Sequence, residues 1–310
     1  MKHVTLGRLS MLVGVALVVG ALLVPGAQAA RKLRVVATIP DLKSLVEAVG
    51  GDLVEVDSLT RGTQNFHEAE VRPSMMLKLR RAEVVVENGL DLDAWVDVAI
   101  EGANNPEIIR GGRGRIEISK GIELLEVPSA RVDRSMGDVH PIGNPHYSMD
   151  PGMVAGVTAN ILEGLARVAP QSRPAFEKNR LAFLARIDEA MARWNATMAP
   201  FKGARVVVDH NQWVYFLTRF GLVEAGSIEE RPGIPPTPSH LTRLIGVMKD
   251  QKVKVILSVP WSDQKIAERV AQETGAKVVP MASGVGAVKG TDGYLETIDY
   301  NVRSVAQALR

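Results

Sequence analysis

Residues 172–200 read "SRPAFEKNRLAFLARIDEAMARWNATMAP", and this stretch decides how the rest of the chain is organised. Large apolar side chains recur in it at spacings of three and four residues, the pattern of one apolar stripe along a helix. They are Leu181, Leu184, Ile187, Met191, Trp194 and Met198. At about 1.5 Å per residue, a helix over 171–200 is roughly 40 Å long. We therefore expect one long helix that packs on a core and connects two parts of the protein.

Short β-branched runs alternate with helical patterns on both sides of this helix. Before it, strands are predicted at "LRVVATI" (33–39), "LVEVDSL" (53–59) and "EVVVENG" (83–89), with helices over 41–50 and 72–82 between them. After it, the alternation resumes with strands predicted at 203–211, 222–228, 253–260 and 276–282, and a final helix over 293–309. Such alternation indicates βαβ units around a mostly parallel sheet.

The expected fold is therefore α/β, with two lobes that each hold a mostly parallel sheet flanked by helices. The N-terminal lobe is predicted over 30–170, the connecting helix over 171–200 and the C-terminal lobe over 201–310. Binding loops of parallel sheets lie at the carboxyl ends of the strands. We therefore expect the functional site in the cleft between the lobes.

Residues 1–29 have the pattern of a cleavable secretory signal. Lys2 and Arg8 give a positive start, the uncharged run "MLVGVALVVGALLV" (11–24) follows, and "AQA" (27–29) matches a signal-peptidase site. The apolar run is shorter than the roughly 20 residues that a transmembrane helix needs. The chain also has no cysteine, so we expect no lipid anchor and a mature protein that is free in a periplasm.

The composition is that of a globular protein with a full core, with 46% hydrophobic and 23% charged residues. Loss of the signal removes two positive charges and leaves a nearly neutral chain, which argues against nucleic acid as a partner. The absence of cysteine excludes thiolate metal sites and cysteine nucleophiles.

Three of the six histidines lie where binding loops are expected. His67 follows the strand at 53–59, His210 ends the strand at 203–211, and His146 lies in "GNPHYSMDP" (143–151), a proline-stiffened loop before a helix. Three neutral imidazoles suit a borderline cation such as Zn²⁺. Their spacing alone does not show that they converge, because "HEAEV" lacks the second histidine of HExxH.

The chain resembles the solute-binding proteins of zinc and manganese ABC importers, the family that includes zinc-uptake binding proteins and the manganese-binding surface proteins once called adhesins. The resemblance covers essentially all of 33–310. It rests on the collinear stretches "NFHEAEVRPSMMLKLRRAEVVVENGLDLDAWV", "GNPHYSMDP", "VVVDHNQWVYFLTRFGL", "IPPTPSHLTRLI" and "YLETIDYNVRSVAQAL". In the family the first three each carry a metal ligand, and the matching histidines here are His67, His146 and His210.

The sequence departs from the family at the fourth ligand. Many members supply a carboxylate after the last strand, where this chain has "PMASGVGAVKG" with Ala282 at the aligned position and Asp292 beyond. Loss of an oxygen ligand favours zinc over manganese. Water or Glu68 could fill the fourth position, and the glycines of that loop could form either plain turns or a mobile flap.

Two further histidines are assigned ordinary roles. Many zinc-uptake members have a long loop rich in His and Asp before the second ligand, and here that region contributes only His140. We expect His140 to be a solvated loop residue. His240, in "TPSHL", is expected to cap a helix or to pack locally.

The resemblance implies a periplasmic substrate-binding component that captures Zn²⁺ as its transported ligand and delivers it to an ABC permease in the inner membrane. It implies a non-enzymatic protein, and we expect a monomer. No Walker A motif is present, so another subunit hydrolyses ATP. The alternatives are a manganese-binding protein of the same importer family and a zinc-dependent hydrolase with Glu68 or Asp209 as general base.

Overall fold

The computed structural model describes residues 31–132, 136–137 and 139–310, and Lys32–Arg310 form one compact unit. The predicted signal over 1–29 lies outside the described residues. Among the helices that are described, none combines the length and the apolar character needed to cross a bilayer.

The first sheet lies in the N-terminal half and is parallel throughout. Its strands are β1 (Leu33–Ala37), β2 (Val54–Ser58), β3 (Val84–Glu87) and β4 (Arg115–Glu117), in the order β2-β1-β3-β4. The connecting helices are α1 (Pro40–Gly50), α2 (Pro73–Arg81) and α3 (Val96–Ala103), with a 3₁₀ turn at Gly51–Leu53. The predicted strands and helices are confirmed, while α3 and β4 are additional elements.

The second sheet has the same topology in the C-terminal half. Its strands are β5 (Arg205–Val208), β6 (Val223–Ser227), β7 (Val255–Ser258) and β8 (Lys277–Pro280), all parallel and in the order β6-β5-β7-β8. Its helices are α6 (Val214–Phe220), α7 (Pro238–Asp250), α8 (Gln264–Thr274) and α9 (Tyr294–Leu309). The strands β1 to β4 therefore correspond in order to β5 to β8.

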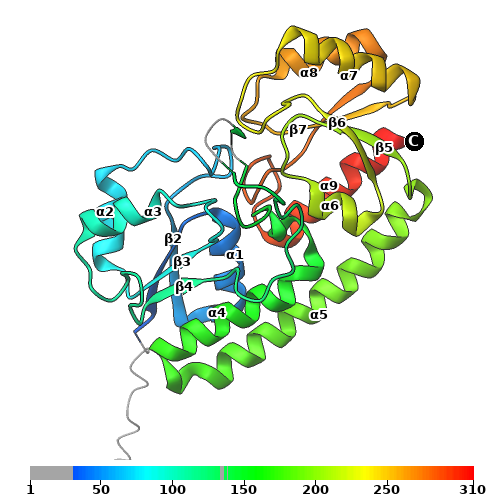
Figure 1. The fold of residues 1–310 in the computed structure, drawn as a ribbon. Coiled ribbons are helices and arrows are strands. Elements are labelled where there is room, and N and C mark those ends of the chain that lie inside the picture. The colour runs from blue at the N-terminus through cyan, green and yellow to red at the C-terminus, as the bar shows by residue number, and fades with distance from the viewer. Residues whose placement is uncertain (1–30, 133–135, 138) are drawn as a thin grey trace, which may run out of the picture. The chain divides into compact units, whose positions relative to one another are not determined.

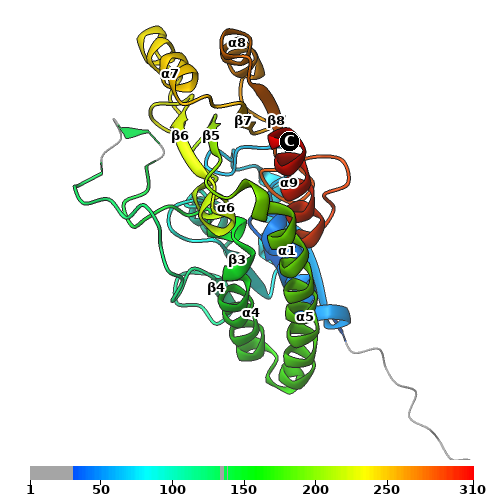
Figure 2. The same ribbon diagram turned by 90° about the vertical axis from the view of Figure 1, so that its right-hand side faces the viewer.

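A helical segment connects the two sheets. It contains the 3₁₀ turns η3 (Tyr147–Met149) and η4 (Pro151–Met153), then α4 (Val154–Val168), η5 (Pro170–Ser172), α5 (Arg173–Met198) and η6 (Ala199–Phe201). The long helix α5 packs against α1, α4 and α9, and both views show it running alongside elements of the two halves (Figures 1 and 2). The predicted connecting helix is therefore present.

The buried face of α5 differs in part from the predicted stripe. Its buried side chains are Phe176, Phe183, Ile187, Ala190, Trp194 and Met198. Leu181 is 63% exposed. Two successive spacings of three residues place Leu181 about 120° around the helix from Ile187, because three residues fall short of a full turn. The prediction for Leu181 was therefore wrong, and the two phenylalanines take its place.

The strands divide their side chains between separate apolar clusters, because successive side chains point to opposite faces. Val35 and Val206 face one continuous cluster that also contains α1, α4, α5, α6 and α9 side chains from both halves. Val36 faces a cluster with α2 and α3, and Val207 faces one with α7 and α8. In Figure 1 these helix pairs lie on the outer faces of the two sheets. One shared core therefore joins the halves.

Candidate metal centre

The three predicted histidines converge on one point. One ring nitrogen from each of His67, His146 and His210 lies within 4.8 Å of the other two. The Nε2 atoms of His67 and His146 are 3.1 Å apart. Two imidazole nitrogens bound to one tetrahedral zinc at about 2.0–2.1 Å would be about 3.3 Å apart. The cluster is therefore already close to the geometry that a small cation requires.

His67 is held by the loop that follows β2. Its backbone N–H donates to Asn65 Oδ1 at 3.1 Å, a short turn that fixes the residue next to the buried Phe66. The Phe66 carbonyl accepts a hydrogen bond from Trp95 Nε1 at 2.9 Å. The loop is thus tied to the segment just before α3, although it has no regular secondary structure.

The loop of His146 is held by a contact within the loop and by the residue that follows β3. Its N–H donates to Asn144 Oδ1 at 3.0 Å. Asn88, which follows β3, donates to the Pro145 carbonyl at 3.1 Å and accepts from the Tyr147 hydroxyl at 2.7 Å. The predicted stiff loop is therefore stiff for two reasons, its prolines and these contacts.

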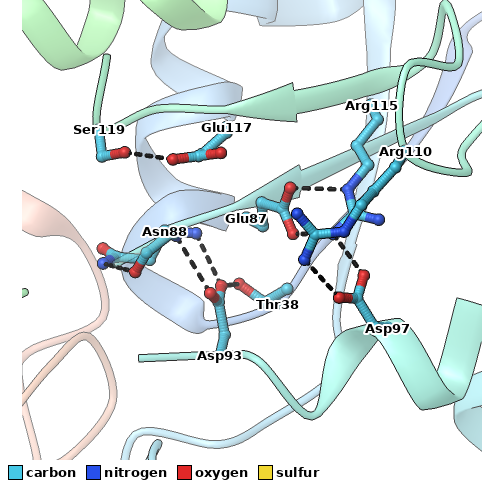
Figure 3. Close-up of polar contacts among 10 residues, drawn as sticks. Thr38, Glu87, Asn88, Asp93, Asp97, Arg110, Arg115, Glu117 and Ser119 are labelled. Carbon is cyan, nitrogen blue, oxygen red and sulfur yellow. Dashed lines mark hydrogen bonds and ion pairs between the residues drawn. The ribbon is translucent and has the colours of Figure 1, made fainter. Parts of the chain in front are cut away.

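Asn88 is in turn fixed by a buried carboxyl group. Asp93 Oδ2 accepts from the Asn88 N–H at 2.7 Å and from Thr38 Oγ1 at 2.6 Å, which joins the carboxyl ends of β1 and β3 (Figure 3). Burial raises the pKa of Asp93 to about 6. Sequence reasoning missed this support. The feature of the sequence that could have indicated it is a polar residue directly after each buried strand, Thr38 after β1 and Asn88 after β3.

His210 lies two residues after the end of β5, and it is 1% exposed. Its Nδ1 lies 2.7 Å from Glu229 Oε2, and the Trp261 ring packs edge-on with centroids 4.9 Å apart. A carboxylate at Nδ1 fixes the proton there and leaves Nε2 free to bind a metal, as in other carboxylate–histidine–metal arrangements. Glu229 was not predicted from the sequence, although it directly follows the strand expected at 222–228.

Burial also sets the protonation of two of these rings. It lowers the pKa of His67 and of His146 well below the usual value, and neighbouring imidazoles lower it further. Both rings are therefore neutral near pH 7, which is the form that binds a metal ion.

Replacement of Glu229 by glutamine should weaken metal binding by about 10- to 100-fold, because a neutral amide oxygen is a weaker acceptor for the His210 Nδ1–H than a carboxylate. Competitive titration with a chelator of known affinity measures this change. Glu230→Gln is the matched control, since Glu230 is half exposed and pairs with Arg243 at 3.0 Å. Equal affinities for the two variants would contradict the orienting role of Glu229.

The other candidate ligands lie elsewhere. Glu68 is exposed and lines a hollow of about 350 Å³ together with Glu229 and Trp261. Ala282 is fully buried, and its backbone N–H and C=O both bond to the Asn301 amide, at 2.7 and 3.0 Å. Asp292 is exposed. Within the described residues, no carboxylate joins the three imidazoles in their 4.8 Å group.

The loop after β8 is packed against the N-terminal half. Its Val285 N–H donates to Asp41 Oδ2 at 3.2 Å, and Ser283 Oγ donates to the Gly62 carbonyl at 3.3 Å. A side chain at Gly284 would meet the Asp41 carboxylate at 2.5 Å. The loop needs its small residues because it lies directly against the N-terminal half.

His140 also differs from its prediction. It is partly buried, and its ring centroid lies 4.9 Å from that of His67. It lines a hollow of about 160 Å³ together with Glu126, His146 and His210. Burial lowers the pKa of His140 to about 4. The expectation of a solvated loop residue was wrong, because a loop without periodicity gives no indication of what it packs against.

His240 behaves as predicted. Its N–H donates to Thr237 Oγ1 at 3.2 Å, which caps α7, and its Nε2 bonds to the Ser227 carbonyl at 2.8 Å. This histidine is used locally and stands apart from the three-histidine group.

Known proteins that are similar to this chain are named for metal binding or metal uptake. The family model described as zinc-uptake complex component A, periplasmic, matches residues 35–308. The iron-binding protein YfeA of Yersinia pestis is 23% identical over 90% of this chain and 86% of its own length. The manganese ABC transporter substrate-binding lipoprotein PsaA of Streptococcus anginosus is 24% identical over 91% of each chain.

A crystal structure of ZnuA has the same fold, with a TM-score of 0.77 and 24% identity over 90% of this chain and 99% of that one. The resemblance predicted from the collinear motifs is thus confirmed across nearly the whole described unit. The chain belongs to the periplasmic zinc-uptake component A family, whose relatives include substrate-binding proteins of metal ABC importers.

Proposed function

We propose that this protein captures Zn²⁺ in the periplasm through His67, His146 and His210 and delivers it to an ABC permease in the inner membrane. The observation that carries the proposal is the convergence of three imidazole nitrogens within 4.8 Å. Two of the rings are held neutral by burial, and the third is oriented by Glu229. Zinc is here the transported ligand rather than a resident cofactor.

The donor set favours zinc over manganese. Imidazole suits zinc, whereas manganese favours oxygen ligands such as carboxylates. Glu68 and Asp292 are both exposed, and the position where many family members supply the acid is Ala282. Relatives named for iron and for manganese show that the fold serves more than one metal, so the ligands of this chain decide the choice.

The arrangement supports a carrier rather than a zinc-dependent hydrolase. A hydrolase would need a general base beside the metal. Asp209 Oδ2 is already bonded to the Val259 N–H at 2.8 Å and to Ser262 Oγ at 2.6 Å, so this oxygen serves to join β5 to the end of β7. The other candidate base, Glu68, is exposed.

Family membership and the predicted signal over 1–29 support two further parts of the proposal, export to the periplasm and docking on a membrane permease. The proposed protein acts as a monomer and, since the sequence has no cysteine, without a cysteine-linked lipid.

The test is metal analysis of the mature protein from residue 30, purified without chelators or affinity tags. We expect one zinc per chain, and Zn²⁺ should outcompete Mn²⁺ in a titration. Preferential manganese binding would overturn the choice of metal, and failure to bind either ion would overturn the function.

A further inference from the structure

His140 lies against the metal centre at a distance typical of a ligand. Its ring centroid is 4.9 Å from that of His67. The centroids of the proposed ligand rings are 5.1, 5.8 and 6.2 Å apart. Imidazoles that share one tetrahedral zinc have ring centres about 5 Å apart, since each nitrogen is about 2.0–2.1 Å from the ion. His140 is thus as close to His67 as His146 is.

One ring nitrogen of His140 is unpaired within the part of the chain that the structure describes. Its Nε2 is buried and makes no hydrogen bond in the described part of the chain. In the tautomer that has its proton on Nδ1, this Nε2 carries a lone pair that can bind a metal ion. Burial of an unpaired polar atom is unfavourable, which leaves a place for a positively charged partner.

The hollow that His140 lines belongs to the same centre. His140 lines it together with His146 and His210, and its volume is about 160 Å³. His140 is not a member of the group whose nitrogens all lie within 4.8 Å of one another. The ring must therefore move inward when the ion is bound, into space that the hollow provides.

We propose that His140 supplies the fourth ligand of the ion through Nε2, giving a site of four imidazoles. This inference rests on the proposed function, because it needs zinc at the three-histidine group. A closed, all-nitrogen site has no open position for a substrate or an activated water, unlike catalytic zinc. It also disfavours an ion that prefers oxygen ligands. His140 would thus determine metal specificity as well as affinity.

The experiment is X-ray absorption spectroscopy of the zinc-loaded protein, with competitive titration of the same samples. Wild type should show four imidazole nitrogens around zinc. His140→Ala should show three imidazoles and one oxygen, with zinc affinity reduced by about 10²- to 10³-fold for an equal share among four ligands. His240→Ala is the matched control and should keep four imidazoles, because His240 bonds only locally, to the Ser227 carbonyl and within the α7 cap.

The outcomes separate this inference from the proposed function. Three imidazoles in both wild type and His140→Ala would overturn the fourth ligand while leaving zinc capture in place. Failure of wild type to bind zinc would overturn the function itself. Should His140→Ala fold poorly, His140→Gln provides a polar replacement, and the same drop from four imidazoles to three is expected.

Discussion

Replacement of His146 by alanine is expected to weaken zinc binding by about 10²- to 10⁴-fold. A structural zinc site contributes about 10–16 kcal/mol, so an equal share for one of three ligands is about 3–5 kcal/mol. His146 is 7% exposed and its Nε2 is only 3.1 Å from that of His67, so the variant loses a buried member of the cluster. Competitive titration with a chelator measures the loss.

His240→Ala is the control for this prediction, because it removes an imidazole that bonds to the Ser227 carbonyl instead of the cluster. Its zinc affinity should equal that of wild type. Thermal unfolding of both metal-free variants checks that neither change disturbs the fold. A His146→Ala variant with unchanged affinity would show that the ion binds elsewhere.

Replacement of Trp194 by alanine is expected to reduce the free energy of unfolding by about 3–5 kcal/mol. Trp194 is 2% exposed in the core that both halves share, and its Nε1 donates to Asp299 Oδ1 on α9 at 3.2 Å. Alanine would leave a cavity between α5 and α9 and would remove this hydrogen bond. Urea denaturation followed by circular dichroism measures the change.

Leu181 on the same helix provides the comparison. It is 63% exposed, so Leu181→Ala should change the free energy of unfolding by no more than about 0.5 kcal/mol. Similar losses for the two variants would mean that α5 contributes through its helical character rather than through its buried face.

The parts of the fold that could be predicted are those with a strong pattern. The strands β1, β3, β5 and β7 are runs of β-branched residues that are buried on both faces. By contrast, β4 is a three-residue edge strand, "RIE", in which only Ile116 is apolar. Arg115 is placed there by its ion pairs with Glu87 and Asp97 (Figure 3), and such long-range contacts leave no periodic signal.

The helix α8 was missed for a different reason. Its buried face consists of Ala267, Val270 and Ala271, which are too small and too few to form a clear apolar stripe. The signals at its ends are nevertheless present in the sequence. Asp263 caps the first turn, and Gly275 ends the helix in the left-handed conformation. Attention to capping residues would have found this helix.

The metal centre could be located from the sequence only in outline. Residues at strand ends meet at one edge of a parallel sheet, which suggested His67, His146 and His210. Their convergence depends on two different sheets, so no local spacing encodes it. The positions of His140 and Glu229 depend on how irregular loops fold back onto the centre, and such loops have no period from which to infer their contacts.

The origin of the three histidines in both halves of the chain has a mechanical consequence for the proposed site. The N-terminal half presents His67 and His146 and the C-terminal half presents His210, so neither half has the full set. In the proposed site, an ion bound by all three histidines would link the two halves, and its binding energy would oppose their displacement. By reciprocity, a partner that holds the halves apart lowers the affinity by the same amount of free energy.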